Sequence, residues 1–169
     1  MRQRWPDWLI ASLLALLLGM ILTRPFGPRP EDLALDVTVG PGPAPDQAEL
    51  TVRWRWLKPP RPLWTDPSAG IGLVYDPARL VVTDPSSWSG FEADATLLPL
   101  GEPLPSRSQF IRHGEDGEIR FVFRRRPGLK GDRWPDPVRV QYIHREHGAG
   151  ALPGQGWVKS VPITLPIGE

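Results

Sequence analysis

Three histidines, His113, His144 and His147, are the residues of this chain best suited to metal binding or proton transfer. The segment His144-Arg-Glu146-His147 resembles a metal-binding motif. Helical motifs place two histidines four residues apart so that both face one metal. Here the spacing is three, at the end of a strand-like run in which His144 and Glu146 share a face and His147 points away. Zinc would need further ligands, from His113 or loop carboxylates. The pattern favours a polar loop over a metal site, and we expect no metal and no cofactor.

Other catalytic arrangements have weaker support. A nucleophile elbow needs G-x-S-x-G between a strand and a helix, and residues 87–90 lack that context. Glu115 and Asp116 lie in a segment that is typical of a solvated hairpin turn. The chain has no cysteine, which excludes disulfides and thiolate chemistry. We therefore expect a protein that is not an enzyme, with an anchored hydrolase or metal enzyme as a remote alternative.

The features that favour binding are exposed aromatic rings and clustered charges. Several tryptophans fall in turn-rich segments, where they either form an interface or plug the ends of the fold. Acidic residues dominate 76–103 and basic residues dominate 104–133, so this pair of segments predicts either a charged docking surface or charges that pair internally. The residues that we expect to contact a partner are Trp64, Trp88, Arg124, Arg125, Arg126, Lys130, Arg133 and Trp134.

The charge balance limits the class of partner. Without Arg2, Arg4 and Asp7 the chain carries equal numbers of basic and acidic residues. Nucleic-acid binding needs a sustained basic surface, so we expect no nucleic acid. The leading hypothesis is a binding or assembly module that docks onto a partner protein as an accessory subunit of a membrane complex. The alternative is a module for cell-wall or other polysaccharide, and anionic lipid headgroups are a further candidate ligand.

An apolar segment near the N-terminus predicts a membrane anchor. Residues 8–23 carry no charge and would form about 24 Å of helix, a little short of the hydrocarbon core. No small-residue cleavage site follows the segment, which favours a retained signal anchor over a signal peptide. We expect a single-pass helix in the cell membrane, with the domain on the extracytoplasmic side. The anchor residues would be Trp5, Trp8, Leu9, Leu13, Leu17, Met20 and Phe26.

The remainder of the chain predicts β-structure. Residues 1–23 would be the anchor, 24–32 a Pro-rich tether and 33–169 one domain. Apolar and polar residues alternate in seven segments, which predicts half-buried strands. These segments are 33–39, 50–56, 71–75, 80–82, 119–123, 138–142 and 157–165, the last an edge strand because of Pro162. Seven or eight strands without an amphipathic helix predict an all-β, antiparallel β-sandwich of immunoglobulin-like type behind one transmembrane helix.

Asp-Pro dipeptides support the division into short strands. They occur at 66–67, 76–77, 84–85 and 136–137. Asp can cap a turn with its side chain while Pro fixes φ, so each dipeptide predicts a chain reversal. The repeated TDPS at 65–68 and 83–86 is explained by shared turn chemistry rather than by an internal repeat.

Two segments carry a resemblance to a known family. The stretch Gly72-Leu-Val-Tyr-Asp-Pro-Ala-Arg-Leu-Val-Val82 resembles the YDP-x-x-L-x-V segment of cohesin-like bacterial sandwich modules. The stretch Gly117-Glu-Ile-Arg-Phe-Val-Phe123 is similar to the G-x-I-x-F strand of that family. The resemblance implies a strand, a turn and the next strand on a jelly-roll or immunoglobulin-like frame. It also implies a non-enzymatic recognition role outside the cytoplasm, and it transfers no binding residue.

Overall fold

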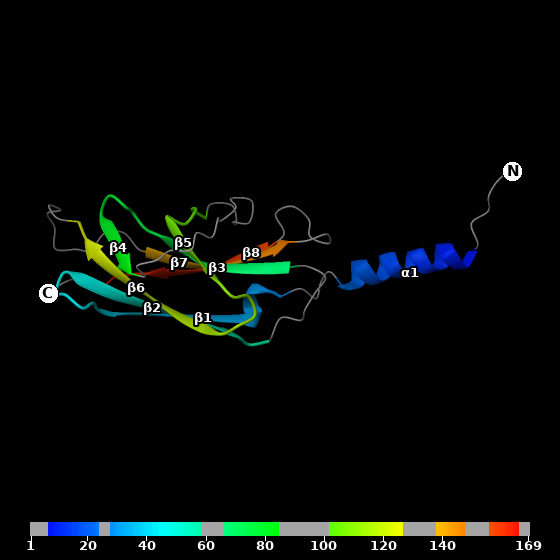
Figure 1. The fold of residues 1–169 in the computed structure, drawn as a ribbon, viewed down its shortest axis with the longest axis horizontal. Coiled ribbons are helices and arrows are strands. Elements are labelled where there is room, and N and C mark those ends of the chain that lie inside the picture. The colour runs from blue at the N-terminus through cyan, green and yellow to red at the C-terminus, as the bar shows by residue number, and fades with distance from the viewer. Residues whose placement is uncertain are drawn as a thin grey trace.

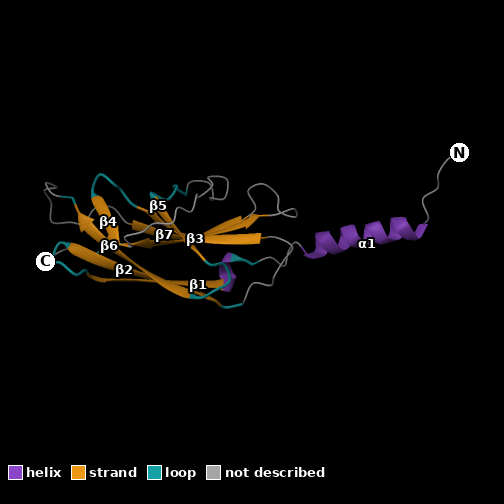
Figure 2. Cartoon of the chain, in the orientation of Figure 1, coloured by secondary structure: helices purple, strands orange, loops and turns teal. Residues whose placement is uncertain are grey.

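The chain forms an N-terminal α-helix followed by a two-layered β-structure (Figure 1). The computed structural model describes residues 7–23, 28–58, 66–84, 102–126, 138–147 and 156–165. Figure 2 distinguishes these helices and strands from the loops. The elements are α1 (Asp7–Thr23), the 3-10 helix η2 (Pro30–Asp32), β1 (Leu33–Pro41), β2 (Gln47–Trp56), β3 (Asp66–Val74), β4 (Leu80–Asp84), β5 (Arg107–Ile111), β6 (Gly117–Arg125), β7 (Val138–His147) and β8 (Gly156–Ile163).

The strands make two four-stranded sheets. Sheet A has the order β1-β2-β6-β4 and sheet B has the order β5-β3-β7-β8. Every neighbouring pair is antiparallel. The prediction of a mostly β protein built from antiparallel sheets is therefore confirmed.

The core lies between the two sheets and follows the period of two that the sequence predicted. On β2 the side chains of Leu50, Val52, Trp54 and Trp56 are buried, while Arg53 and Arg55 between them are exposed. Burying one such side chain contributes about 1.5–3 kcal/mol, so the alternation fixes which face of β2 turns inward. Sheet B contributes buried residues in the same rhythm, including Ile71, Leu73, Val138, Val140 and Tyr142.

Two sequence-based expectations about elements were wrong. The dipeptide Asp66-Pro67 does not reverse the chain, because both residues lie in β3 and pair with His147 and Glu146. Strand β5 was missed, because its sequence RSQFI is short and lacks apolar alternation. The edge position of the strand with Pro162 is confirmed, since β8 ends sheet B.

A strap of residues 102–106 crosses the outer face of sheet B before β5 begins. Glu102 accepts hydrogen bonds from Arg139 at 3.2 Å and from Gln141 at 3.3 Å. Ser106 N donates to Leu73 O at 2.7 Å. A Cβ on Gly72 would lie 2.9 Å from Pro105 Cβ, so glycine permits this close approach. The strap explains why Gln141 is fully buried although it faces away from the core.

The strand register defines two ends of the sandwich. At one end Leu33 of β1 pairs with Trp56 of β2, and we call this the tether end. At the other, the far end, Gln47 of β2 pairs with Arg124 of β6. Trp157 Nε1 donates to Pro28 O at 2.8 Å, so the segment that follows α1 joins the sandwich at the tether end. Residues 24–27 can span at most about 18 Å between α1 and Pro28.

Candidate functional site

The far end carries the described part of the predicted docking surface. Arg124 Nε donates to Asp46 Oδ2 at 2.6 Å, and both side chains are about half exposed, at 54% and 49%. Arg126 Nε donates to Pro77 O at 2.8 Å, in the turn that precedes β4. Arg125 also has an interaction partner. These three consecutive arginines lie at the far end, where Arg124 and Arg126 are held by contacts within the domain. Their predicted contact with a partner stays a prediction.

The other predicted contact residues fall outside the described ranges. They are Trp64, Trp88, Lys130, Arg133 and Trp134, and among the anchor residues Trp5 and Phe26. The predicted partner contacts of the first five residues and the predicted anchoring by Trp5 and Phe26 stay predictions.

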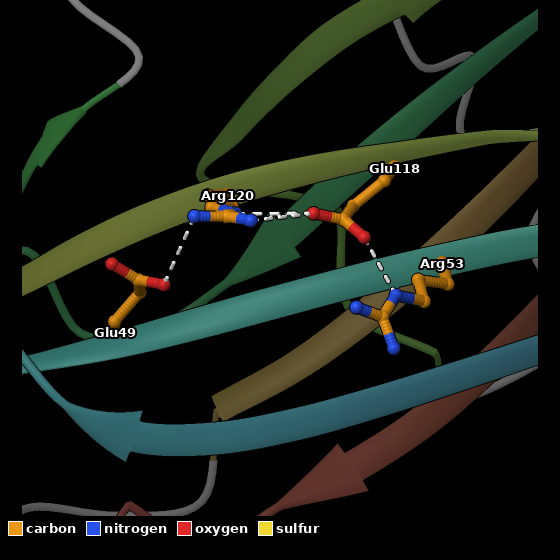
Figure 3. Close-up of polar contacts among 4 residues, drawn as sticks. All are labelled: Glu49, Arg53, Glu118 and Arg120. Atoms are coloured by element: carbon orange, nitrogen blue, oxygen red, sulfur yellow. Dashed lines mark hydrogen bonds and ion pairs between the residues drawn. The ribbon is translucent and has the colours of Figure 1, made fainter.

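The outer face of sheet A holds a row of alternating charges (Figure 3). Arg53 Nε of β2 lies 2.6 Å from Glu118 Oε2 of β6. Arg120 NH2 lies 3.1 Å from Glu118 Oε1, and its NH1 lies 3.9 Å from Glu49 Oε1. Hydrogen bonds from Arg53 and then Arg120 lower the pKa of Glu118. The hydrogen bond to Glu118 likewise raises the pKa of Arg53.

The ion pairs of this row join charges that are segregated along the sequence. Two arginines of the basic segment, both on β6, meet acidic residues from β2 and the turn before it, a part of the chain far away in sequence. Arg120 lies beside Glu49, and Arg124 lies beside Asp46. Among the described residues, Arg120 and Arg124 are thus neutralised across strands by acidic residues that a linear count of charges does not bring near them.

The tether end carries a buried cluster of histidine and aromatic rings. The ring centroids of His113 and His144 are 4.8 Å apart, and that of Trp157 lies 5.1 Å from His144. Trp56 contacts His113 edge-on at 5.3 Å, and Tyr142 stacks on Trp157 at 5.6 Å. His144 is fully buried in β7, so its expected position in a polar loop was wrong. We call these five residues the histidine cluster.

The signal for the histidine cluster was present in the sequence. Val138, Val140 and Tyr142 face the core on alternate positions, and His144 is the next residue in that series. Extending the strand by two residues would have placed the imidazole inside. The link to His113 has no sequence signal, because it depends on where the turn before β6 folds back.

Burial governs the protonation of the histidine cluster. It lowers the pKa of His144 to about 3, with a smaller contribution from His113, whose own pKa burial also lowers. Glu146 Oε1 lies 3.5 Å from His144 Nε2, and burial raises the pKa of that carboxyl. Both ring nitrogens of His144 and Nε2 of His113 make no hydrogen bond within the described ranges. Burial therefore holds both rings in the neutral form at pH 7.

The described residues contain no group of three or more His, Asp or Glu side chains placed to hold a metal ion. The acidic pair Glu115 and Asp116 serves the fold instead. Asp116 Oδ1 accepts a hydrogen bond from Trp56 N at 2.7 Å, and Glu115 O accepts one from Trp54 Nε1 at 2.9 Å. The turn that holds this pair is therefore built into the sandwich and not merely solvated.

Helix α1 carries no charged residue after Asp7. Seven of its large apolar side chains are exposed by 49–68%: Trp8, Ile10, Leu13, Leu14, Leu16, Leu17 and Leu18. None of the described strands packs substantially against it. In the described part of the chain, no helix has both the length and the apolar character that crossing a bilayer requires.

No protein-family model matches the chain, and no curated protein matches it.

Proposed function

We propose that the chain is a membrane-attached docking module, in which α1 holds a β-sandwich at the cell membrane and the sandwich binds a partner protein. One observation carries the proposal, namely that α1 has no charged residue after Asp7 and exposes seven large apolar side chains. A helix that is apolar all round needs apolar surroundings, either lipid or other protein. Attachment on the extracytoplasmic side as an accessory subunit of a membrane complex is part of the proposal.

The arrangement of the two ends supports a docking role. The tether joins the sandwich through Trp157 and through Lys159 Nζ, which donates to Pro30 O at 3.1 Å. Arg124 lies at the far end, where it pairs with Gln47 at the start of β2, and Arg126 follows directly after β6. A domain held at one end presents the other end to partners, and exposed arginine is favoured in protein interfaces.

The strand order supports an immunoglobulin-like frame. If β5 is treated as an insertion, the order β1-β2-β6-β4 corresponds to A-B-E-D and the order β3-β7-β8 to C-F-G. The segment that resembles cohesin-like modules runs from β3 through the turn at Asp76 to β4, and so passes from sheet B to sheet A. Such frames host many recognition roles, which makes the frame a support for binding and not a specification of the ligand.

Membrane fractionation of the full chain tests the attachment. The protein should stay in the pellet through high salt and carbonate, and detergent should release it. Leu13→Arg with Leu17→Arg should move it to the soluble fraction, because each charge opposes burial in lipid by about 2.5–3.5 kcal/mol. Leu104→Arg, which replaces an exposed leucine outside α1, is the matched control and should remain in the pellet.

Native mass spectrometry of the detergent-extracted protein tests the docking. A stoichiometric companion that is lost from Arg124→Glu/Arg126→Glu supports the proposal. A protein that is soluble without detergent, or that leaves the membrane alone at its own mass, would contradict it. Tryptophan fluorescence that responds to glycans would favour the polysaccharide-binding alternative.

A further inference from the structure

The outer edge of β1 pairs with no other described strand. β1 ends sheet A, and its pairing with β2 runs without interruption from Leu33–Trp56 to Pro41–Ala48. Within the described ranges, Leu33 O is the one backbone group of this edge with a partner, the Nζ of Lys159. From Ala34 to Gly40 the outward N–H and C=O groups have none among the described residues. An edge of this kind pairs readily with another chain.

The other long edge and one short edge carry features that discourage such pairing. β8 holds Lys159, whose ammonium turns inward to the tether, and Pro162, which lacks an N–H. β4 has five residues, and its register with β6 breaks between Val82 and Asp84. β1 has nine residues, no lysine, no register break and no proline before its last position. β1 is therefore the described long edge that lacks this protection.

An apolar row beneath the β1 edge is only partly covered. Leu35, Val37 and Val39 pack against the core but remain half-buried. β8, the edge strand of the opposite sheet, contacts β1 and contributes half-buried Ile163. A strand added beside β1 would cover this side of the sandwich, with its inward side chains extending the row. The backbone edge and the apolar row are separate observations that point to the same occupant.

We propose that the outer edge of β1 binds an extended segment of a partner protein, which adds a fifth strand to sheet A. This proposal rests on the docking role proposed above. Main-chain hydrogen bonds would supply affinity, and apolar side chains at every second position would supply specificity over Leu35, Val37 and Val39. Asp36 is exposed on the outer face, so a basic or uncharged residue suits the position beside it.

The short segment between α1 and β1 favours a partner protein over a second copy of this chain as the occupant of the β1 edge. Two copies attached to one membrane by residues 24–27 would both begin β1 close to the bilayer. With both sandwiches standing on the membrane, the two β1 strands would run in the same direction. Parallel pairing is not two-fold symmetric, so it does not give the closed isologous contact that most dimers use. A segment of another protein is free to run antiparallel.

A labelled peptide tests the edge directly on the full chain in detergent micelles. The probe is fluorescein-Lys-Val-Thr-Val-Thr-Val-Lys, and fluorescence anisotropy measures its binding. A permuted peptide with its three valines consecutive keeps the composition and loses the alternation. A third peptide, N-methylated at alternate residues along one edge, loses the donors while the protein is unchanged. Both control peptides should bind at least about tenfold more weakly.

Variants of the chain locate the binding edge. Val37→Lys places a charge in the apolar row and should weaken the first peptide at least about tenfold. Thr83→Lys, at an exposed position on edge strand β4, is the matched control and should bind like the natural chain. Thermal unfolding confirms that both variants fold. Equal binding of all three peptides, or no effect of Val37→Lys, would overturn the proposal.

The absence of cysteine gives a test for the competing occupant. Thr38 is exposed on β1, so Thr38→Cys introduces the one thiol of the chain at this edge. Disulfide-linked dimers of this variant, absent from Thr83→Cys, would show a second copy and overturn the partner proposal. If the extracted complex keeps its companion in Val37→Lys, the edge proposal fails while membrane attachment and docking stand.

Discussion

The two ends of the sandwich place their polar groups in opposite environments, exposed at one end and buried at the other. At the far end, Arg124 and Asp46 form an ion pair about half exposed to water. At the tether end, His144 is fully buried, and its ring nitrogens make no hydrogen bond within the described ranges. Water screens and solvates the charges of Arg124 and Asp46, whereas the buried His144 ring is stable among aromatic rings because it is neutral.

This difference separates adaptable surface from fixed structure. Groups at the far end can exchange an internal partner for an external one at little cost, which suits docking. Groups at the tether end cannot be charged, moved or exposed without loss of packing. We therefore expect substitutions at the tether end to change stability and substitutions at the far end to change binding.

The largest effect is expected from Trp56→Ala. The ring is 8% exposed and contacts His113, Tyr142 and Trp157, so its removal opens a cavity in the histidine cluster. The free energy of unfolding should fall by about 3–5 kcal/mol, measured by urea titration. Leu57→Ala, at the adjacent and exposed position, should change it by less than about 0.5 kcal/mol. Equal losses in both variants would contradict the contrast between buried and exposed sites.

Acid should destabilise the protein through His144. Below about pH 6.5 the unfolded chain binds a proton on this histidine, while the folded chain resists until about pH 3. The unfolded state then holds more protons than the folded state. The free energy of unfolding therefore decreases by about 1.4 kcal/mol for each unit that the pH is lowered below about 6.5, or by roughly 2–3 kcal/mol at pH 4.5. His113 acts in the same direction. Glu146 opposes it, because its raised pKa favours proton uptake by the folded state.

His144→Phe separates this effect from general acid sensitivity. Phenylalanine keeps an aromatic ring of similar size and removes the titrating nitrogens. Urea unfolding at about pH 7 and about pH 4.5 should show a smaller loss in the variant than in the natural chain. An identical loss in both proteins would mean that other groups govern acid unfolding.

The sequence predicted the inward face of each strand with a regular apolar alternation. It did not predict contacts between segments that are distant in the chain. The alternation in β2 and β7 predicted which of their side chains face the core, because a strand directs every second side chain to the same face. The same rule, extended to His144, would have buried it. By contrast, the pairing of Arg124 with Asp46 follows from the register of β2 against β6, which no local pattern encodes.

The same limit applies to the strap and to the edge of β1. Residues 102–106 cover sheet B because Pro105 meets Gly72 across a gap of more than thirty positions in sequence. The open edge of β1 follows from sheet order, which requires knowing that β2 pairs with β6 on its other side. Strands with apolar alternation were therefore predictable and β5 was not, whereas the neighbours of each strand, and with them the candidate docking sites, required the structure.

A middle-sized effect is expected from Asp116→Ala at the tether end. The variant leaves Trp56 N without its acceptor, and an unsatisfied part-buried N–H costs about 1–3 kcal/mol of unfolding free energy. Asp116→Asn keeps a side-chain oxygen and should lose less. Glu115→Ala removes a neighbouring carboxylate that is 62% exposed and forms an ion pair with exposed Arg112, and it should be nearly neutral. Chemical denaturation of the three variants would refute the assignment if Glu115→Ala were as costly as Asp116→Ala.

The smallest effect is expected at the far end. A double-mutant cycle of Arg124→Ala and Asp46→Ala should give a coupling of about 0.2–1 kcal/mol, because both side chains are half exposed. The coupling should shrink as salt rises to about 1 M, where charges are screened within about 3 Å. A coupling above about 2 kcal/mol that resists salt would mean that this pair is structural like the tether end. Arg124 would then be held too firmly to exchange Asp46 for a partner, and the docking surface would have to lie elsewhere on the sandwich.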